Sequence, residues 1–194
     1  KFKIQTVKTP LAEVHGSFRD NHIETEYEHV IVATEAMNTK EWEYCAALAS
    51  LIQLFYSLKV GHKVVKYLHN QFGVKYTDYF KFLYSCDLPV VQYFNERAAG
   101  VVNGGARCQY DERYGQIYWE PEELAFLNLS LDKENFYEGV WESTIQFLNK
   151  TGIDYDSVKL ASLFEEQSKE VPEHDGYESL EEYATKVILY GRKS

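Results

Sequence analysis

The sequence is poor in cysteine, methionine, proline and basic residues. Its 194 residues include 3 Cys, 1 Met and 4 Pro, and 20 Lys+Arg stand against 30 Asp+Glu. The formal net charge of −10 makes the chain a poor general binder of nucleic acid or of an anionic membrane, because phosphate groups would be repelled. Cys45, Cys86 and Cys108 are odd in number and widely spaced. They therefore argue against a disulfide framework and favour a reducing compartment, the cytoplasm.

Long apolar runs are also lacking. No stretch approaches the roughly 18 apolar residues that indicate a transmembrane helix, and residues 1–5 begin no apolar signal sequence. The first residue is Lys, which fits either tag removal or a piece of a longer protein. Aromatic residues, in contrast, are abundant, with 16 Tyr, 11 Phe and 3 Trp. Because Tyr tolerates one apolar and one wet side, its excess indicates an interface or a lined cleft in addition to the core.

Residues 1–36 predict an extended N-terminal segment of strands and loop. Apolar and polar residues alternate from Phe2, and the run 27–34 is rich in β-branched residues. Pro, Gly and scattered charges over 9–25 indicate a loop between the two strands. Two strands without a third are not stable alone. The segment must therefore pack on helices or pair with something absent from the chain.

Residues 37–194 predict a mainly α, multi-helix domain that forms a single compact unit with the N-terminal segment. Apolar residues at three- and four-residue steps predict seven to eight helices. Asn38 with Glu41, and Ser179 with Glu182, are typical of capping boxes. A small hairpin is expected near 107–119. The predicted helices span about 39–59, 62–72, 77–85, 89–103, a stretch from 121, 133–151, 155–169 and 180–190.

Several faces of these helices are assigned from the same periodicity. In the first helix a stripe is expected to face the core, with Cys45 acting as a small hydrophobe. Paired acids at helix starts or outer faces are expected to be solvated. The stripe consists of Trp42, Cys45, Ala46, Ala49, Ile52, Gln53 and Tyr56, and the acidic pairs are Glu122/Glu123, Glu165/Glu166 and Glu181/Glu182.

No motif with an assigned chemistry is present, so the sequence predicts no catalytic, cofactor or metal residue. The cysteine spacings fit neither a zinc site nor an iron–sulfur run. Gly104-Gly105 follows a predicted helix and so lies at its negative end, which disfavours a phosphate site. His62 and His69 are seven apart, whereas metal ligands on one helix are normally three or four apart.

Six residues are candidates for an interface or a cleft because of their type and placement. His62 and Lys66 belong to the densest basic patch, which is either a solvated face or an anion site. An unrecognised enzyme is a further alternative, and it requires Glu41, His62 and Asp78 to converge in one cleft. The six candidates are Trp42, Tyr56, His62, Lys66, Arg97 and Arg107.

Three segments carry a resemblance to a known family. The stretch Thr34-Glu35-Ala36-Met37-Asn38-Thr39-Lys40-Glu41-Trp42 leads from a strand into an aromatic-rich helix, followed by Leu58-Lys59-Val60-Gly61 and Tyr67-Leu68. This order resembles the C-terminal region of cobalamin-binding-domain radical SAM proteins. Ile4-Gln5-Thr6-Val7 with His15-Gly16 is similar to the run that follows their catalytic barrel. Leu180-Glu181-Glu182-Tyr183-Ala184 with Tyr190-Gly191-Arg192-Lys193 is similar to their chain terminus.

The resemblance implies an accessory C-terminal domain that is non-catalytic alone, packs on the catalytic barrel of the same parent chain and covers its substrate. The parent would use an iron–sulfur cluster, S-adenosylmethionine and cobalamin. This sequence contains neither the family's CxxxCxxC motif nor its N-terminal cobalamin-binding domain, so no catalytic or cofactor residue is carried over. The alternative is a free-standing helical binding or oligomerisation module, a homo-oligomer with a Tyr-rich interface.

Overall fold

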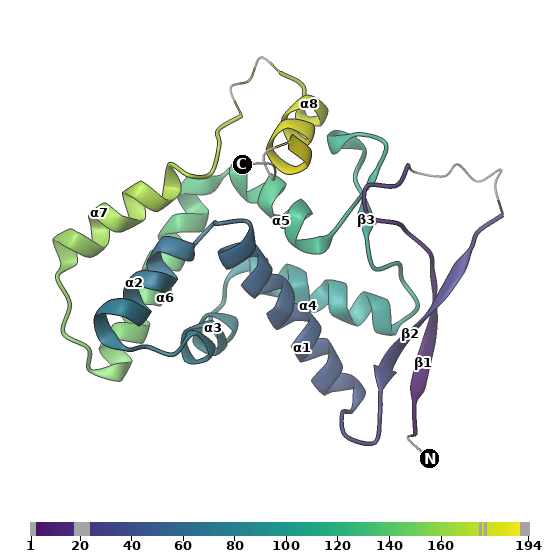
Figure 1. Ribbon diagram of the computed structural model, residues 1–194, viewed down its shortest axis with the longest axis horizontal. Helices are drawn as coiled ribbons and strands as arrows, with labels where there is room; N and C mark the ends of the chain where they lie inside the picture. Colours follow the sequence, from purple (N-terminus) through teal and green to yellow (C-terminus); the bar gives the residue numbers. More distant parts are fainter. Residues whose placement is uncertain (1–2, 18–23, 175, 177, 191–194) are drawn as a thin grey trace.

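The computed structural model describes residues 3–17, 24–174, 176 and 178–190, and these are mainly helical, as predicted (Figure 1). Predictions that concern Phe2, or residues 191–193 at the C-terminus, lie outside this range. The elements in chain order are β1 (Gln5–Pro10), β2 (Tyr27–Ala33), α1 (Thr39–Ile52), the π-helix η1 (Gln53–Ser57), α2 (His62–Phe72), α3 (Tyr76–Tyr84), α4 (Pro89–Val102), β3 (Gln109–Tyr110), the 3-10 helix η2 (Glu112–Tyr114), β4 (Tyr118–Trp119), α5 (Pro121–Ser130), α6 (Lys133–Thr151), α7 (Ser157–Ser168), α8 (Leu180–Ala184) and the π-helix η3 (Thr185–Tyr190).

The N-terminal strands form an antiparallel ribbon at one side of the molecule, with α2, α6 and α7 on the opposite side and α1 and α4 between them (Figure 1). Thr9 and Val32 on its inward face are buried, and the ribbon contacts α1 and α4. The prediction that the strands pack on helices is therefore confirmed. Tyr27 and Ile31 lie on the outward face and are exposed.

Local sequence signals set several of the element ends. Asn38 Oδ1 accepts a hydrogen bond from the Glu41 amide at 3.0 Å, and Glu41 Oε2 accepts one from the Asn38 amide at 2.7 Å. Ser179 and Glu182 form the second predicted capping box, at the start of α8. Helix α2 has its predicted bounds and ends at Gly73, whose φ of 68° lies in the left-handed region that favours glycine. The expected hairpin is formed by β3 and β4.

The assignment of the core-facing stripe on α1 is wrong for most of its members. The buried residues of α1 are Ala47 and Leu51, and burial continues with Leu54 and Phe55 in η1. Apolar residues occupy several faces of this segment and it packs against both α3 and α4, so periodicity alone did not select the correct face. The stripe residues that are exposed are Cys45, Ala49, Ile52, Gln53 and Tyr56.

The first predicted helix ends in a π-helical turn and a sharp bend before α2. The segments 39–57 and 62–72 meet at 89°. Lys59 adopts a left-handed conformation with φ of 61°, and Gly61 lies against the buried Phe55 ring, so that a Cβ added there would lie 2.3 Å from Phe55 Cδ1. Glycine is therefore required at position 61 by close packing. Within the described ranges no single helix is long and apolar enough to cross a membrane, although these two bent segments together have the necessary length and composition.

Substituting Gly61 tests this packing. We expect Gly61→Ala to lower the free energy of unfolding by about 1–3 kcal/mol, because the new methyl group must displace Phe55 in a packed core. Urea unfolding measures the change. Gly100→Ala is the matched control, since a Cβ there meets only Arg97 Nη1 at 3.9 Å. This substitution removes a glycine from a helix, which should raise the free energy of unfolding by about 0.5–1 kcal/mol. Equal effects of the two substitutions would contradict the close approach.

Candidate functional site

The start of α5 brings two acidic side chains into the interior. Glu123 is fully buried and Glu122 is nearly so. His15 Nε2 lies 2.8 Å from Glu123 Oε2, and the His15 ring meets Trp119 edge-on with the ring centroids 5.5 Å apart. Glu123 also accepts a hydrogen bond from the Glu120 amide at 3.2 Å, which caps the helix. The prediction that this acidic pair is solvated is therefore wrong, because both side chains are buried in the fold and Glu123 is paired there with His15.

Two hollows lie along the seam between α4 and α5. The first, which we call the Arg97 cleft, has a volume of about 260 Å³ and opens between α1, α4 and the start of α5. Helix α1 contributes Trp42, α4 contributes Arg97, and the loop that follows α4 contributes Arg107. Glu120 and Glu122 also line the cleft. Three of the six residues proposed from sequence thus meet in one cleft.

Arg97 is held in place by a single hydrogen bond among the described residues. Its Nη2 donates to the carbonyl oxygen of Ala106 at 2.8 Å. Its Nε is buried and has no acceptor within the described part of the chain. Burial lowers the pKa of the guanidinium, although the neighbouring Tyr93 and Cys108 act in the opposite direction. A cationic group is therefore partly withdrawn from water and lacks a carboxylate partner in the described ranges.

Arg107 connects the rim of this cleft to the ribbon. Its side chain is 55% exposed, and its Nη1 lies 3.8 Å from Glu28 Oε2 on β2. An exposed pair at this distance contributes little stability. The contact nevertheless places the Arg107 guanidinium at the cleft entrance, with the ribbon beside this side chain.

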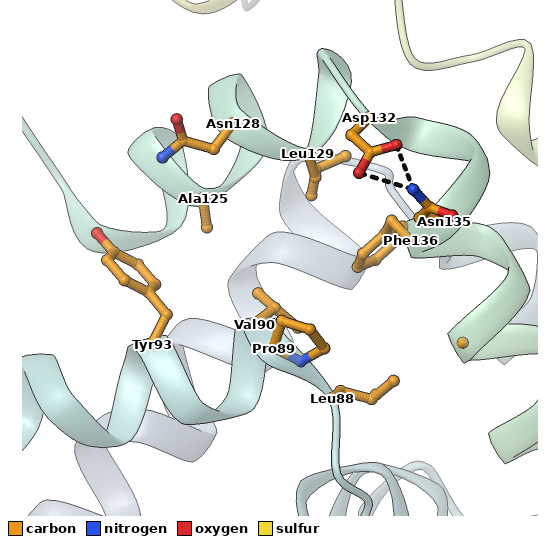
Figure 2. Close-up of a pocket in the computed structure, with 11 residues that line it drawn as sticks. Leu88, Pro89, Val90, Tyr93, Ala125, Asn128, Leu129, Asp132, Asn135 and Phe136 are labelled. Atoms are coloured by element: carbon orange, nitrogen blue, oxygen red, sulfur yellow. Dashed lines mark hydrogen bonds between the residues drawn. The ribbon is translucent and has the colours of Figure 1, made fainter.

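The second hollow, which we call the apolar groove, has a volume of about 350 Å³ and is lined mainly by carbon (Figure 2). It lies between the start of α4, α5 and the start of α6. Asp132 lies at the N-cap position of α6, and its carboxylate accepts hydrogen bonds from Asn135 Nδ2 at 2.8 and 2.9 Å. Sequence reasoning missed this groove because its lining residues have the composition of a core. The apolar lining comprises Leu88, Val90, Tyr93, Ala125, Leu129 and Phe136.

The other three candidates lie elsewhere. Tyr56 packs with Tyr76 at a centroid distance of 6.2 Å, and Lys66 Nζ lies 5.8 Å from the Tyr56 centroid. We call this surface the Tyr56 patch, and it also includes His69, whose ring lies 4.5 Å from that of Tyr76. His62 forms a separate contact, with its Nδ1 3.5 Å from a carboxylate oxygen of Glu170 in the turn that follows α7. Tyr56 and Lys66 therefore meet, and His62 does not join them.

The acid–base alternative is not supported by the contacts of the described residues. Glu41 is engaged in capping α1, His62 faces Glu170, and Asp78 lies in the first turn of α3 beside Thr77. Each side chain thus has a different local partner. No hydrogen bond or ion pair joins these three side chains to one another in the described ranges.

The cysteines lie apart from one another. Cys45 is exposed on α1, Cys86 follows α3 and is partly buried, and Cys108 is buried before β3. Within the described ranges, no three His, Cys, Asp or Glu side chains form a group that could hold a metal ion. These cysteines do not form the CxxxCxxC motif of the family that the sequence resembles, and the prediction about cofactors remains a prediction.

Comparisons with known proteins assign no family. No family model matches the chain, and no curated protein matches it. The resemblance to radical SAM proteins therefore rests on the residues quoted for it.

The reactivity of the thiols should follow their burial. Burial, with a smaller contribution from the negative charge of Glu120, raises the pKa of the Cys108 thiol to about 12. The thiolate is the reactive form, so Cys108 in the folded protein should react with a disulfide reagent only as the pH approaches that value. Cys45 should react readily at pH 8. Mass spectrometry after brief labelling identifies the modified residue, and rapid native labelling of Cys108 at pH 8 would contradict the expectation.

Proposed function

We propose that this chain is the accessory C-terminal domain of a cobalamin-dependent radical SAM enzyme. It is non-catalytic by itself, packs on the catalytic barrel of its own parent chain and works in the cytoplasm. The observation that carries the proposal is the outward face of the β1–β2 ribbon. Ile4, Tyr27 and Ile31 on or beside this face are 56%, 51% and 47% exposed, and neighbouring exposed apolar side chains are typical of a surface that binds a partner. The parent barrel is the occupant to which we assign this face.

The stretch that carries the family resemblance supports this arrangement. The Thr34 amide donates to the Met37 carbonyl at 2.8 Å, which closes the turn between β2 and α1. The Asn38–Glu41 capping box then starts α1 and brings Trp42 to the Arg97 cleft. One continuous segment therefore connects the outward-facing ribbon to the cleft. A barrel that packs on the ribbon would lie close to the cleft entrance. This domain could then cover the barrel and its substrate.

The cofactors of the proposed enzyme belong to the rest of the parent chain. An iron–sulfur cluster, S-adenosylmethionine and cobalamin would supply its radical chemistry. We assign none of them to this domain, whose three cysteines occupy separate environments. The role of this chain is to pack on the catalytic barrel and to cover its substrate. Its free thiols are compatible with the reducing cytoplasm.

The first test is the reading frame upstream of Lys1. The proposal requires it to encode a CxxxCxxC motif and a cobalamin-binding domain in the same open frame. Sequencing the genomic region around the gene provides the answer. A frame that begins at this domain, with no upstream CxxxCxxC, would overturn the proposal.

The second test compares the full-length parent with its Ile31→Asp variant by hydrogen exchange. We expect the amides of β1 and β2 to exchange more slowly in the full-length protein than in this chain alone, because the barrel covers them. Ile31→Asp should restore rapid exchange, since it places a charge in the apolar contact. Val158→Asp is the control, because Val158 is a 77% exposed residue on α7 and its replacement should leave the ribbon protected. Equal exchange in the parent and in this chain alone would exclude the ribbon as the contact.

The Tyr56 patch favours a second candidate function, a helical binding or oligomerisation module. Tyr56 and Tyr76 are 43% and 37% exposed, and tyrosine is enriched at protein interfaces. This alternative predicts a homo-oligomer of the chain alone that becomes monomeric on Tyr76→Ser and is unaffected by Val158→Ser. Light scattering measures the mass. A strict monomer of the unsubstituted chain at all concentrations would eliminate homo-oligomerisation.

A further inference from the structure

The starting point is the guanidinium of Arg97, which has no carboxylate partner in the described ranges. Arginine keeps its positive charge in proteins, and removing such a charge from water is unfavourable unless an anion or several acceptors compensate. In the described ranges Arg97 has one neutral acceptor, the Ala106 carbonyl, and a buried Nε without any. The cleft beside it has a volume of about 260 Å³. An anionic group that enters the cleft would compensate the charge of the guanidinium.

The surroundings of Arg97 select the type of anion. Arg107 places a second guanidinium at the entrance, and two such groups are suited to a planar, bidentate oxyanion. Glu120 and Glu122 line the same cleft, and their negative charges would oppose a doubly charged phosphate more strongly than a singly charged carboxylate. The half-buried Trp42 and the small side chains of Ala46 and Ala49 provide an apolar wall. These features together favour one carboxylate attached to a flat apolar body.

We propose that the Arg97 cleft is a binding site for the carboxylate of a small aromatic or apolar organic acid. The carboxylate lies against the N–H groups of Arg97, with Arg107 closing over it from the rim. The apolar body lies against Trp42. The site consists of residues of this chain alone, so it does not depend on the accessory-domain proposal and can be tested without a parent enzyme.

Benzoate is the probe that tests the site, and benzamide is its uncharged counterpart of the same shape. We expect saturable benzoate binding by calorimetry, accompanied by a change in tryptophan fluorescence that Trp42→Phe abolishes. Benzamide should bind at least about tenfold more weakly, because it lacks the charge that Arg97 requires. Inorganic phosphate should also bind more weakly. No saturable benzoate binding up to about 10 mM, or tighter binding of phosphate, would overturn the proposal.

Arginine variants show where the probe binds. Arg97→Met should weaken benzoate binding at least about tenfold, and Arg107→Met should weaken it by a smaller factor, about threefold, because Arg107 is more exposed. The latter variant lies at the surface and tests the site even if Arg97→Met disturbs folding. Arg113→Met is the matched control, since Arg113 is an exposed arginine already paired with Asp111 at 2.6 Å. Unchanged benzoate affinity in both cleft variants, or equal loss in the control, would refute the assignment.

Discussion

The bend between η1 and α2 depends on one buried side-chain amide, that of Gln167. Its Oε1 accepts from the Lys63 amide at 2.8 Å, and its Nε2 donates to the Lys59 carbonyl at 2.6 Å. Tyr137 on α6 adds a hydrogen bond from its hydroxyl to the Val60 carbonyl at 2.7 Å. The Val60 carbonyl belongs to a buried residue, and leaving such a group without a partner costs about 1–3 kcal/mol. Helices α6 and α7 thus hold the turn that separates α1 from α2, and α1 forms one wall of the Arg97 cleft.

Those features that depend on neighbours in the sequence could be predicted. The two capping boxes, the bounds of α2 and its end at Gly73 all result from side chains within four residues of one another. The hairpin of β3 and β4 was expected for the same reason. The residues that make local hydrogen bonds or adopt glycine conformations lie beside the element ends that they determine. Element ends and types were therefore accessible without knowledge of the packing.

Burial was less accessible, because it depends on partners that are distant in sequence. Glu123 meets His15 across 108 positions, and no local pattern indicates that a loop histidine would cover this carboxylate. The face of α1 was misassigned because α3 and α4 both contact it. The candidate site shows the same difference between what residue type predicts and what only the packing reveals. Trp42, Arg97 and Arg107 were chosen by residue type, but only the fold shows that they share a cleft and that His62 lies apart from it.

The ribbon has a further consequence for how the chain behaves at high concentration. Its two strands pair only with each other in the described ranges, so their outer backbone groups could add a strand from a second molecule. Natural sheets commonly oppose such aggregation with lysine at exposed edges. Lys8 occupies this position, with its Nζ 3.9 Å from the centroid of the Tyr27 ring on the outward face. The face that we propose as the contact surface for a partner therefore carries a charge that discourages edge-to-edge stacking of identical copies.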